Sequence, residues 1–474
     1  MFKILSHASM MVESGDAQLL VDPWLVGSCY WRSWWNYPPV KRDAISDLNP
    51  TAIYITHVHW DHWHGPSLKR FLGSDLEIIT HDEPNKRSYR DLAKFGFKKI
   101  RVLKHGESYK IGEIKITPYQ FGLFLNDSAL VIETPDVKIL NANDCKIAGS
   151  SLKQIKDTHG SFDFAMRSHS SANDRICYSI EGSNNVFDDP DHYTRAFKLF
   201  MDNVKPKYAV PFASNHCHLH KDVFQFNKII NDPFRLSRDI EKLGGLLESK
   251  IKVLLTGDSW TPNRGFCIDD KNENFFLEKE VCLQDYRTSV NDQLEKYYNQ
   301  QSKLKVSERI IQKFENHIRS IPKFAKRKLK GWSFSINVTG GREEVYLVVD
   351  PYQSTVLRIE KKLFEDSHAK IFMPVDIFKS AVQLNMFHHS GISKRNRYQF
   401  KNENNLRKWE IMNGLLEKVE LEVFPLSLKY VGSIVYNYFR RWRELIVYTE
   451  AYFLKRGGLK MYDIEEKILE KSSS

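Results

Sequence analysis

Cysteine is scarce in this sequence: there are six among 474 residues, and no two of them form a C-x-x-C pair. Disulfide-stapled secreted domains and small zinc modules both need closely spaced cysteines. We therefore expect reduced thiols in a cytoplasmic protein. The six residues are Cys29, Cys145, Cys177, Cys217, Cys267 and Cys282.

Long apolar runs are missing as well. No uninterrupted apolar segment approaches the roughly 20 residues that a membrane-spanning helix needs, and the sequence contains no internal repeat. The first residues, Met1-Phe-Lys-Ile-Leu5, pass directly into a strand pattern and lack the features of a signal peptide. The sequence therefore predicts membrane contact that is peripheral at most.

Acidic residues are outnumbered by basic ones, with 59 Asp and Glu against 70 Lys and Arg, which gives a net charge of +11. At 42% hydrophobic and 27% charged residues, the composition is otherwise ordinary for a globular protein. The positive charge favours acidic partners, such as phosphorylated or nucleotide-linked molecules, nucleic acid or an anionic membrane face. Charge alone does not choose among them.

One stretch is dense in potential metal ligands: Ile53-Tyr-Ile-Thr-His-Val-His-Trp-Asp-His-Trp-His-Gly65. It opens as a buried-strand pattern, and Pro66 then suits the first turn of a helix. The ligands therefore fall on a loop between a strand end and a helix start. His57 and His59 point to one side of an extended backbone, whereas Asp61 and His62 lie beyond the bend and can face a second ion. Imidazole and carboxylate ligands suit zinc, iron or manganese.

An aromatic loop over residues 26–40 precedes this motif, with Tyr30, Trp31, Trp34 and Trp35 around Arg32. One interpretation is a substrate-binding wall, in which Trp34 and Trp35 stack on the substrate and Arg32 contacts an anion. The other is a small apolar cluster beneath a long loop. The sequence leaves both open.

The spacing His-x-His-x-Asp-His, followed by Gly65, resembles the metallo-β-lactamase superfamily. A closer resemblance, to the metallo-β-lactamase-like part of the CMP-N-acetylneuraminate hydroxylase family, covers residues 1–235. It rests on Asp22-Pro-Trp-Leu-Val-Gly27, Trp34-Trp35, Pro38-Pro39, Leu140-Asn141, Asp144-Cys145 and Pro211-Phe-Ala213. Those hydroxylases also carry an N-terminal Rieske domain. This sequence opens at the first metallo-β-lactamase strand, and Cys217-His-Leu-His220 has no second C-x-x-H, so we expect no Rieske cluster.

The resemblance implies roles for residues outside the central motif. Asp144, at the end of an apolar strand, corresponds to the carboxylate that bridges two metal ions in the superfamily. Asp22 corresponds to a residue that supports the metal site from behind. The last metal ligand is expected in the loop that contains His216, His218 and His220. Register against the hydroxylases favours His220, and closeness to the strand end favours His216.

This sequence differs from the superfamily pattern at one ligand position. The superfamily places a third histidine ligand of the first metal shortly before a strand, but residues 121–132 contain no histidine. Asp127 is the nearest substitute, but we prefer the interpretation that it caps or turns the chain before the strand. Further along, Arg167 and His169 follow a predicted strand. We expect Arg167 to bind substrate, and we expect His169 to transfer a proton or to be an exposed loop residue.

Three segments are predicted: a catalytic domain over residues 1–265, a polar helical connector over 266–330, and an α+β domain over 331–474. The last contains a hairpin around Thr339-Gly-Gly341 and a long helix over 426–456, and it weakly resembles sterol-carrier modules. The expected fold class is thus α/β, with an αββα metallo-β-lactamase sandwich, the connector and the C-terminal α+β (sterol-carrier-like) domain.

Three functions follow. Two divalent metal ions, zinc or iron, would activate a shared water held by Asp61, which predicts a hydrolase acting on a small anionic, sugar- or nucleotide-linked substrate. The hydroxylase resemblance and the missing histidine instead suggest an iron-dependent oxygenase. It would hydroxylate an N-acyl or nucleotide sugar with electrons from a separate ferredoxin-type donor. The third is a non-catalytic binding protein. We expect no nucleic-acid partner, and a homo-oligomer remains compatible with the sequence.

Overall fold

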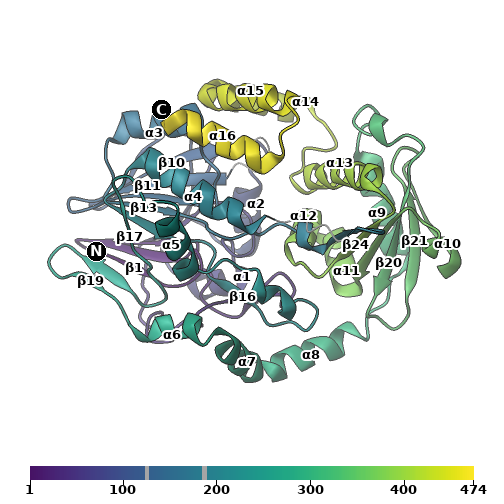
Figure 1. Cartoon of the computed structure of the whole chain (residues 1–474), viewed down its shortest axis with the longest axis horizontal. Coiled ribbons are helices and arrows are strands. Elements are labelled where there is room, and N and C mark those ends of the chain that lie inside the picture. Colours follow the sequence, from purple (N-terminus) through teal and green to yellow (C-terminus); the bar gives the residue numbers. More distant parts are fainter. Residues whose placement is uncertain (123–126, 184–188, 474) are drawn as a thin grey trace.

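The computed structural model describes residues 1–122, 127–183 and 189–473. Its first part contains two large sheets that pack face to face (Figure 1). The apolar side chains between them, including Ile4, Val12, Ile116 and Ile132, are fully buried. The two sheets therefore form the central layers of a sandwich.

The first sheet has eight strands. One of its strands, β6 (Ala52–Ile55), is a fully buried and continuously apolar run, as expected of a parallel strand that is covered on both faces. In order of pairing, the strands are β19 (Gly265–Cys267), β18 (Ser259–Thr261), β1 (Phe2–Ile4), β2 (Met10–Ser14), β3 (Ala17–Val21), β6 (Ala52–Ile55), β7 (Glu77–His81) and β8 (Ile100–Leu103).

The second sheet has seven strands, and a sheet of three short strands lies beside it. The seven are β17 (Lys250–Ile251), β15 (Tyr208–Pro211), β13 (Phe164–Arg167), β12 (Lys138–Asn143), β11 (Asp127–Glu133), β10 (Ile114–Phe121) and β9 (Tyr109–Ile111). The short strands are β16 (His216–His218), β5 (Trp34–Asn36) and β4 (Ser28–Cys29). Because β5 and β16 pair, the aromatic loop lies directly against the loop that contains His216.

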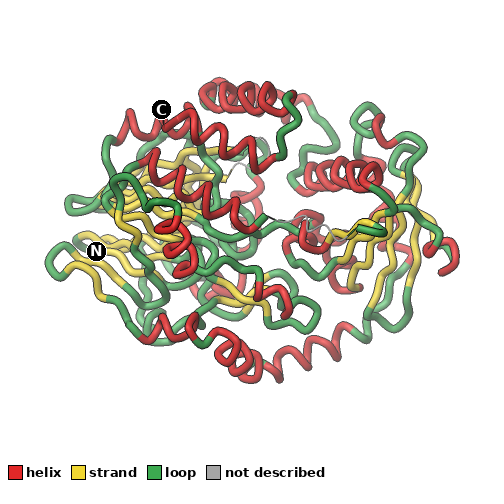
Figure 2. The backbone as a smooth tube through the Cα atoms, viewed as in Figure 1, coloured by secondary structure: helices red, strands yellow, loops and turns green. Residues whose placement is uncertain are grey.

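Helices cover the outer face of each sheet, which completes the predicted αββα sandwich (Figure 2). The first sheet is covered by α1 (Gly65–Leu68), the 3-10 turn η1 (Lys69–Phe71) and α2 (Arg87–Phe95). The second is covered by α3 (Gly149–His159), α4 (Pro190–Val204), α5 (Pro233–Lys242), α15 (Trp442–Arg456) and α16 (Met461–Ser473). Two of these helices come from the C-terminal end of the chain.

A run of helices then leads to a second unit, built on a six-stranded sheet (Figure 1). The run consists of α6 (Lys271–Leu277), α7 (Lys279–Ser289) and α8 (Asn291–Gln301). The sheet consists of β14 (Tyr178–Ile180), β24 (Arg397–Phe400), β23 (Ala369–Pro374), β20 (Phe334–Thr339), β21 (Val345–Asp350) and β22 (Thr355–Arg358). The predicted hairpin around residues 339–341 is confirmed by the β20–β21 pair.

Helices pack on one face of this sheet and close its apolar core. They are α9 (Glu308–Ser320), α11 (Val375–Leu384), α12 (Phe387–Ile392) and α13 (Glu403–Glu420). The short helix α10 (Lys361–Glu365) contacts β20 and β21. The cavity inside this core measures about 20 Å³, which is room for about one water molecule. An apolar ligand of sterol size does not fit there.

Two features differ from the sequence expectation. The long helix predicted over 426–456 is interrupted at Arg441, giving α14 (Leu428–Arg440) and α15. In addition, β14, which belongs by sequence to the first unit, pairs in parallel with β24 of the second. Pairing between such distant segments leaves no local signal in the sequence.

The topology brings several loops to one edge of the sandwich. Strands β1, β3 and β6 run parallel in the first sheet, and β12, β13 and β15 run parallel in the second. Because the carboxyl ends of parallel strands meet at the same edge, the loops that follow them are neighbours. The residues in these loops include His7, Asp22, His57, His59, Asp61, His62, Asp144, His169 and His216.

Candidate metal centre

The loop after β6 is held by one buried carboxylate. Asp22 accepts hydrogen bonds from the backbone N–H of Thr56 at 2.8 Å and from its hydroxyl at 2.7 Å. The chain then turns so tightly that the N–H groups of His62 and Trp63 both donate to the carbonyl of His59. This turn directs the side chains on either side of it into the space between the two sheets' loops.

The first group of potential ligands consists of His57, His59 and Asp144. His57 Nε2 lies 2.9 Å from His59 Nδ1 and 3.6 Å from Asp144 Oδ2. One potential ligand atom from each residue lies within 4.8 Å of the others. The Asp144 side chain is 27% exposed, so this group is accessible from one side.

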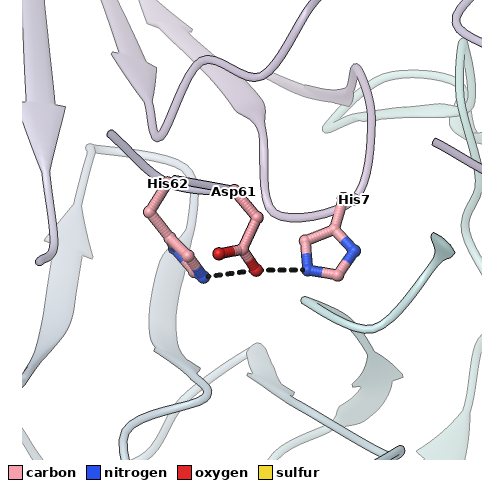
Figure 3. A group of neighbouring side chains, drawn as sticks. All are labelled: His7, Asp61 and His62. Atoms are coloured by element: carbon pink, nitrogen blue, oxygen red, sulfur yellow. Dashed lines mark ion pairs between the residues drawn. The ribbon is translucent and has the colours of Figure 1, made fainter. Parts of the chain in front are cut away.

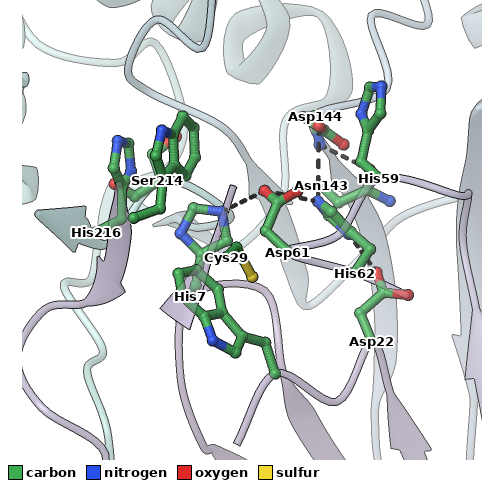
Figure 4. A network of polar contacts seen from close by, with 12 residues as sticks. His7, Asp22, Cys29, His59, Asp61, His62, Asn143, Asp144, Ser214 and His216 are labelled. Carbon is green, nitrogen blue, oxygen red and sulfur yellow. Dashed lines mark hydrogen bonds and ion pairs between the residues drawn. The ribbon is translucent and has the colours of Figure 1, made fainter. Parts of the chain in front are cut away.

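The second group consists of His7, Asp61 and His62 (Figure 3). Asp61 Oδ2 lies 3.1 Å from His7 Nε2 and 3.6 Å from His62 Nε2. All three side chains are buried. His62 Nε2 also lies 3.6 Å from Asp144 Oδ2, so Asp144 adjoins both groups (Figure 4). This is the position that a bridging carboxylate requires.

Each group is braced by further polar contacts. Asp22 accepts a hydrogen bond from His62 Nδ1 at 2.7 Å, which fixes the ring and leaves Nε2 pointing at the centre. The hydroxyl of Tyr30 donates to Asp61 Oδ1 at 2.5 Å. Asn143 Oδ1 accepts from the backbone N–H of Asp144 at 2.7 Å, which orients the start of that loop.

The charges of the centre favour cation binding. Burial acts to raise the pKa of Asp61, but neighbouring His62 and His7 outweigh it and hold that pKa well below its usual range. Burial lowers the pKa of His59, and His57 and His389 lower it further, so this imidazole is neutral, as metal binding requires. Against burial, Asp144, Asp22 and Asp61 raise the pKa of His62, so the site attracts a positive charge.

Unpartnered buried atoms provide a direct test of whether these residues fit metal ions. Among the described residues, His62 Nε2 and Asp144 Oδ1 are buried and have no hydrogen-bond partner. A buried polar atom without a partner costs about 1–3 kcal/mol, and two such atoms that converge on one small space are satisfied together by a cation. One of these atoms belongs to each ligand group, so the residues present fit a cation in each group.

Histidines of the β15–β16 segment lie at different depths around this centre. The ring of His216 stacks on Trp34 at 3.7 Å and lies 5.5 Å from the ring of His7, next to the second group. His218 lies 5.3 Å from the His216 ring, one step further away. His220 packs against the edge of Tyr298 and accepts from the N–H of Asp222, and it is part of neither ligand group.

The remaining candidate residues are more enclosed than the sequence indicates. His169 is fully buried, and burial together with His7 lowers its pKa to about 3. Arg167 forms an ion pair with Glu465 of α16 at 2.5 Å and lies over the ring of Phe200, so it fastens the C-terminal helix. Asp127 is not in either ligand group, and burial raises its pKa to about 6.

The aromatic loop divides into a buried part and a surface part. Trp34 and Trp35 are buried, and Trp34 covers His216. Arg32 instead lines a surface cavity of about 360 Å³ together with Tyr30, Trp31, Trp60, Trp63 and Tyr297. Because Tyr30 also contacts Asp61, it separates this cavity from the metal centre.

The backbone of this loop is strained. Tyr30, Trp31 and Arg32 are consecutive and have φ values of 49°, 55° and 64°. Left-handed conformations of such residues cost about 1–3 kcal/mol each and persist only where the surroundings enforce them. Here they turn Tyr30 inward to Asp61 and leave Arg32 at the cavity.

Sequence reasoning gave no metal-binding role to His7, although its position after a strand stood out. It missed a histidine pair from the C-terminal unit altogether. The rings of His388 and His389, in α12, lie 5.4 Å and 5.3 Å from the ring of His59. His389 Nδ1 donates to Glu420 at 2.5 Å, and its buried Nε2 has no partner among the described residues.

Comparison with known proteins agrees with this geometry. Residues 2–121 match the family model described as "Beta-lactamase superfamily domain". With the αββα sandwich, this match shows the class of the fold: the first unit of the chain has the metallo-β-lactamase fold.

Two curated proteins are similar to more than half of this chain. The chain is 25% identical over 315 residues to a putative Rieske 2Fe-2S iron–sulfur protein of Mycolicibacterium smegmatis, covering 60% of this chain and 58% of that protein. It is 25% identical over 281 residues to the cytidine monophosphate-N-acetylneuraminic acid hydroxylase of Gorilla gorilla gorilla, covering 56% and 44%. The matched region thus spans about half the length of these curated relatives.

Among solved structures, an isothiocyanate hydrolase from Delia radicum gut bacteria is similar at 14% identity and a TM-score of 0.39. The match covers 54% of this chain and 97% of that one.

Proposed function

We propose that this protein is a dinuclear iron oxygenase that hydroxylates a small anionic substrate of the N-acyl-sugar or nucleotide-sugar class. One observation carries the proposal. Both ligand groups consist of two histidines and one aspartate: His57, His59 and Asp144 in the first, and His7, Asp61 and His62 in the second. Two histidines and a carboxylate with open positions are the ligand set of non-haem iron oxygenases.

Two further points support iron over zinc. The third histidine that completes the first zinc site in hydrolases of the superfamily has no counterpart in residues 121–132. In addition, the curated relatives named above are a hydroxylase and an iron–sulfur protein. Neither point depends on the geometry of the ligand groups, so they support the proposal independently.

Bound iron would supply the activation of dioxygen. In the overall reaction, a substrate C–H bond becomes C–OH, the second oxygen atom leaves as water, and two electrons and two protons are consumed. The electrons would come from a separate ferredoxin-type iron–sulfur protein. The chain's own residues shield the second group from water, because Tyr30, Trp34 and the three ligands of that group are buried.

The surface cavity at the aromatic loop fits the proposed substrate class. Trp31 and Trp60 offer flat faces on which a nucleobase or sugar ring can stack, and Arg32 offers a positive charge to phosphate or carboxylate. Tyr30 forms the wall between this cavity and Asp61. A nucleotide-sugar bound there would place its charged part at Arg32, with Tyr30 between it and Asp61.

Hydrolysis is the second candidate, and the state of Asp61 favours it. This carboxylate is ionised, and it lies between His7 and His62. A carboxylate in that position can hold a water for attack on an ester, lactone or phosphodiester beside two zinc ions. The same site geometry thus serves either reaction, and the metal decides between them.

The test is elemental analysis of the full chain, purified without chelators, followed by oxygen-uptake measurements with a ferredoxin reducing system and candidate nucleotide sugars. We expect about two iron ions per chain and substrate-dependent oxygen uptake with formation of a hydroxylated product. Two zinc ions, with hydrolysis of phosphodiester or lactone substrates and no oxygen uptake, would establish the second candidate instead. A chain that binds no metal after loading would overturn both.

A further inference from the structure

Helices α14 and α15 present large apolar side chains to solvent. Half of the exposed large apolar residues of the described chain lie within residues 426–453, although this segment is a small part of it. Leu428 is 93% exposed and Phe439 is 79% exposed. The full set is Leu426, Leu428, Val431, Val435, Tyr436, Phe439, Trp442, Leu445, Ile446, Tyr452 and Phe453. We call these residues the apolar ridge.

The side of these helices that faces the protein is, by contrast, polar near the break between them. Asn437, Arg441 and Glu444 are buried. Arg441 Nε lies 3.0 Å from Glu444 Oε2, and Glu444 Oε1 accepts from the N–H of Gly122 at 2.7 Å. Tyr430 and Val447 are also buried, so the helices are anchored by a few apolar side chains and by polar contacts at the break, while most of their large apolar side chains face outward.

Within residues 426–458 the exposed charges are nearly all positive, and one of these cations, Arg443, pairs with Asp157 of the neighbouring α3 at 3.5 Å. Lys429, Arg440, Lys455 and Arg456 are exposed, and Arg443 is half-buried, whereas Glu444 is buried and Glu450 is the one partly exposed acid of residues 426–458, all of which the structure describes. Several cations lie over aromatic rings of the ridge: Arg440 over Tyr436, Arg443 over Trp442 and Arg456 over Tyr452. Aromatic and basic side chains in such pairs suit the boundary between lipid headgroups and acyl chains.

The sign of these charges distinguishes between two occupants. In a two-fold dimer through the ridge, the same cations would face each other across the interface and repel. An anionic lipid surface instead complements the cations, and its acyl layer takes up the apolar side chains. No helix among the described residues is long and apolar enough to cross a membrane, so contact would be confined to the interface.

We propose that the apolar ridge and its flanking cations form a docking surface for an anionic phospholipid bilayer, with α14 and α15 lying in the plane of the interface. This surface is separate from the metal centre, and its function does not depend on which reaction the centre performs. A docked chain would carry out its chemistry next to a membrane without being inserted in it.

The test is co-sedimentation of the full chain with phosphatidylcholine vesicles, with and without phosphatidylserine. We expect binding to the anionic vesicles that weakens as salt is raised, and little binding to phosphatidylcholine alone. The triple variant Phe439→Ser, Trp442→Ser, Phe453→Ser should lower the apparent affinity by about tenfold or more. A matched control, Leu247→Ser, Leu277→Ser, Leu363→Ser, removes exposed apolar residues elsewhere and should bind as the unmodified chain does.

Sedimentation velocity of the unmodified chain completes the design. Failure of the unmodified chain to bind anionic vesicles overturns the proposal, whatever the variants do. A dimer that the triple variant dissociates, without vesicle binding, assigns the ridge to a second copy and also overturns it. Equal loss of vesicle binding in the control variant would also overturn the proposal, because binding would then depend on the overall hydrophobicity of the surface and not on the ridge.

Discussion

The two ligand groups of the metal centre differ in how they are held. The second group, His7, Asp61 and His62, is wholly buried and is braced by Asp22 and Tyr30 from its own half of the chain. The first group is open at Asp144, and α12 of the C-terminal unit contacts it at His59. One group is thus pre-organised by neighbouring loops, and the other is completed by a distant part of the sequence.

This difference suggests that the two groups have different roles in binding and reactivity. A buried, fully braced group binds its ion tightly and excludes water, because its ligands pay little to adopt the binding geometry. An accessible group leaves positions for substrate or oxygen. We therefore expect the ion of the second group to exchange slowly and that of the first to exchange faster, and the following variants test this contrast.

The largest effect is expected from Asp144→Ala, since this residue adjoins both groups. Both ions should bind more than about 100-fold more weakly, because the variant removes a ligand, and even supporting residues contribute 10–100-fold. Elemental analysis after gel filtration measures this as a fall from two ions to almost none. The exposed Asp136→Ala is the matched control. Retention of either ion at full occupancy would show that Asp144 is not shared.

An intermediate effect is expected from His7→Ala. This change should remove the ion of the second group and leave that of the first, so that metal content falls from about two ions per chain to about one. His59→Ala is the reciprocal variant and should spare the ion of the second group. Cobalt titration with optical detection distinguishes the two sites. If His7→Ala still binds two ions with unchanged spectra, His7 is not a ligand.

The smallest effect is expected from Asp22→Asn. The carboxylate accepts from His62 Nδ1 but belongs to neither ligand group, so the variant should weaken the second ion by about 10–100-fold and leave the first unchanged. Competition with a metallochromic chelator measures both affinities. Asp16→Asn, at an exposed position, serves as the control. An equal loss at both sites would mean that Asp22 acts by holding the Thr56 turn rather than His62.

Much of the sandwich, and the grouping of the motif residues with Asp144, could be predicted from the sequence because their signals are local. The buried strand β6 and the ligands that follow it occupy one short stretch. Asp144 could be found because it, too, directly follows an apolar strand. In both cases the strand end fixes where the side chain lies, so a pattern of a few residues carries the information.

Other parts of the centre depend on contacts between distant segments. His7 ends up beside Asp61 because β1 runs parallel to β3 and β6 through an intervening hairpin, which the spacing of residues does not reveal. The approach of His388 and His389 to His59 depends on how the second unit packs against the first. The choice among His216, His218 and His220 likewise depended on β16 pairing with β5.

The β14–β24 pair has a consequence for treating this chain as a set of interchangeable modules. Residues 178–180 form an edge strand of a sheet whose other members lie beyond residue 333. A chimaera joined between the two units would leave β14 without its partner strand β24, and it would replace the helix that contains His388 and His389. The two halves therefore have to be exchanged together, and a comparison confined to the first 121 residues covers only part of the candidate metal centre.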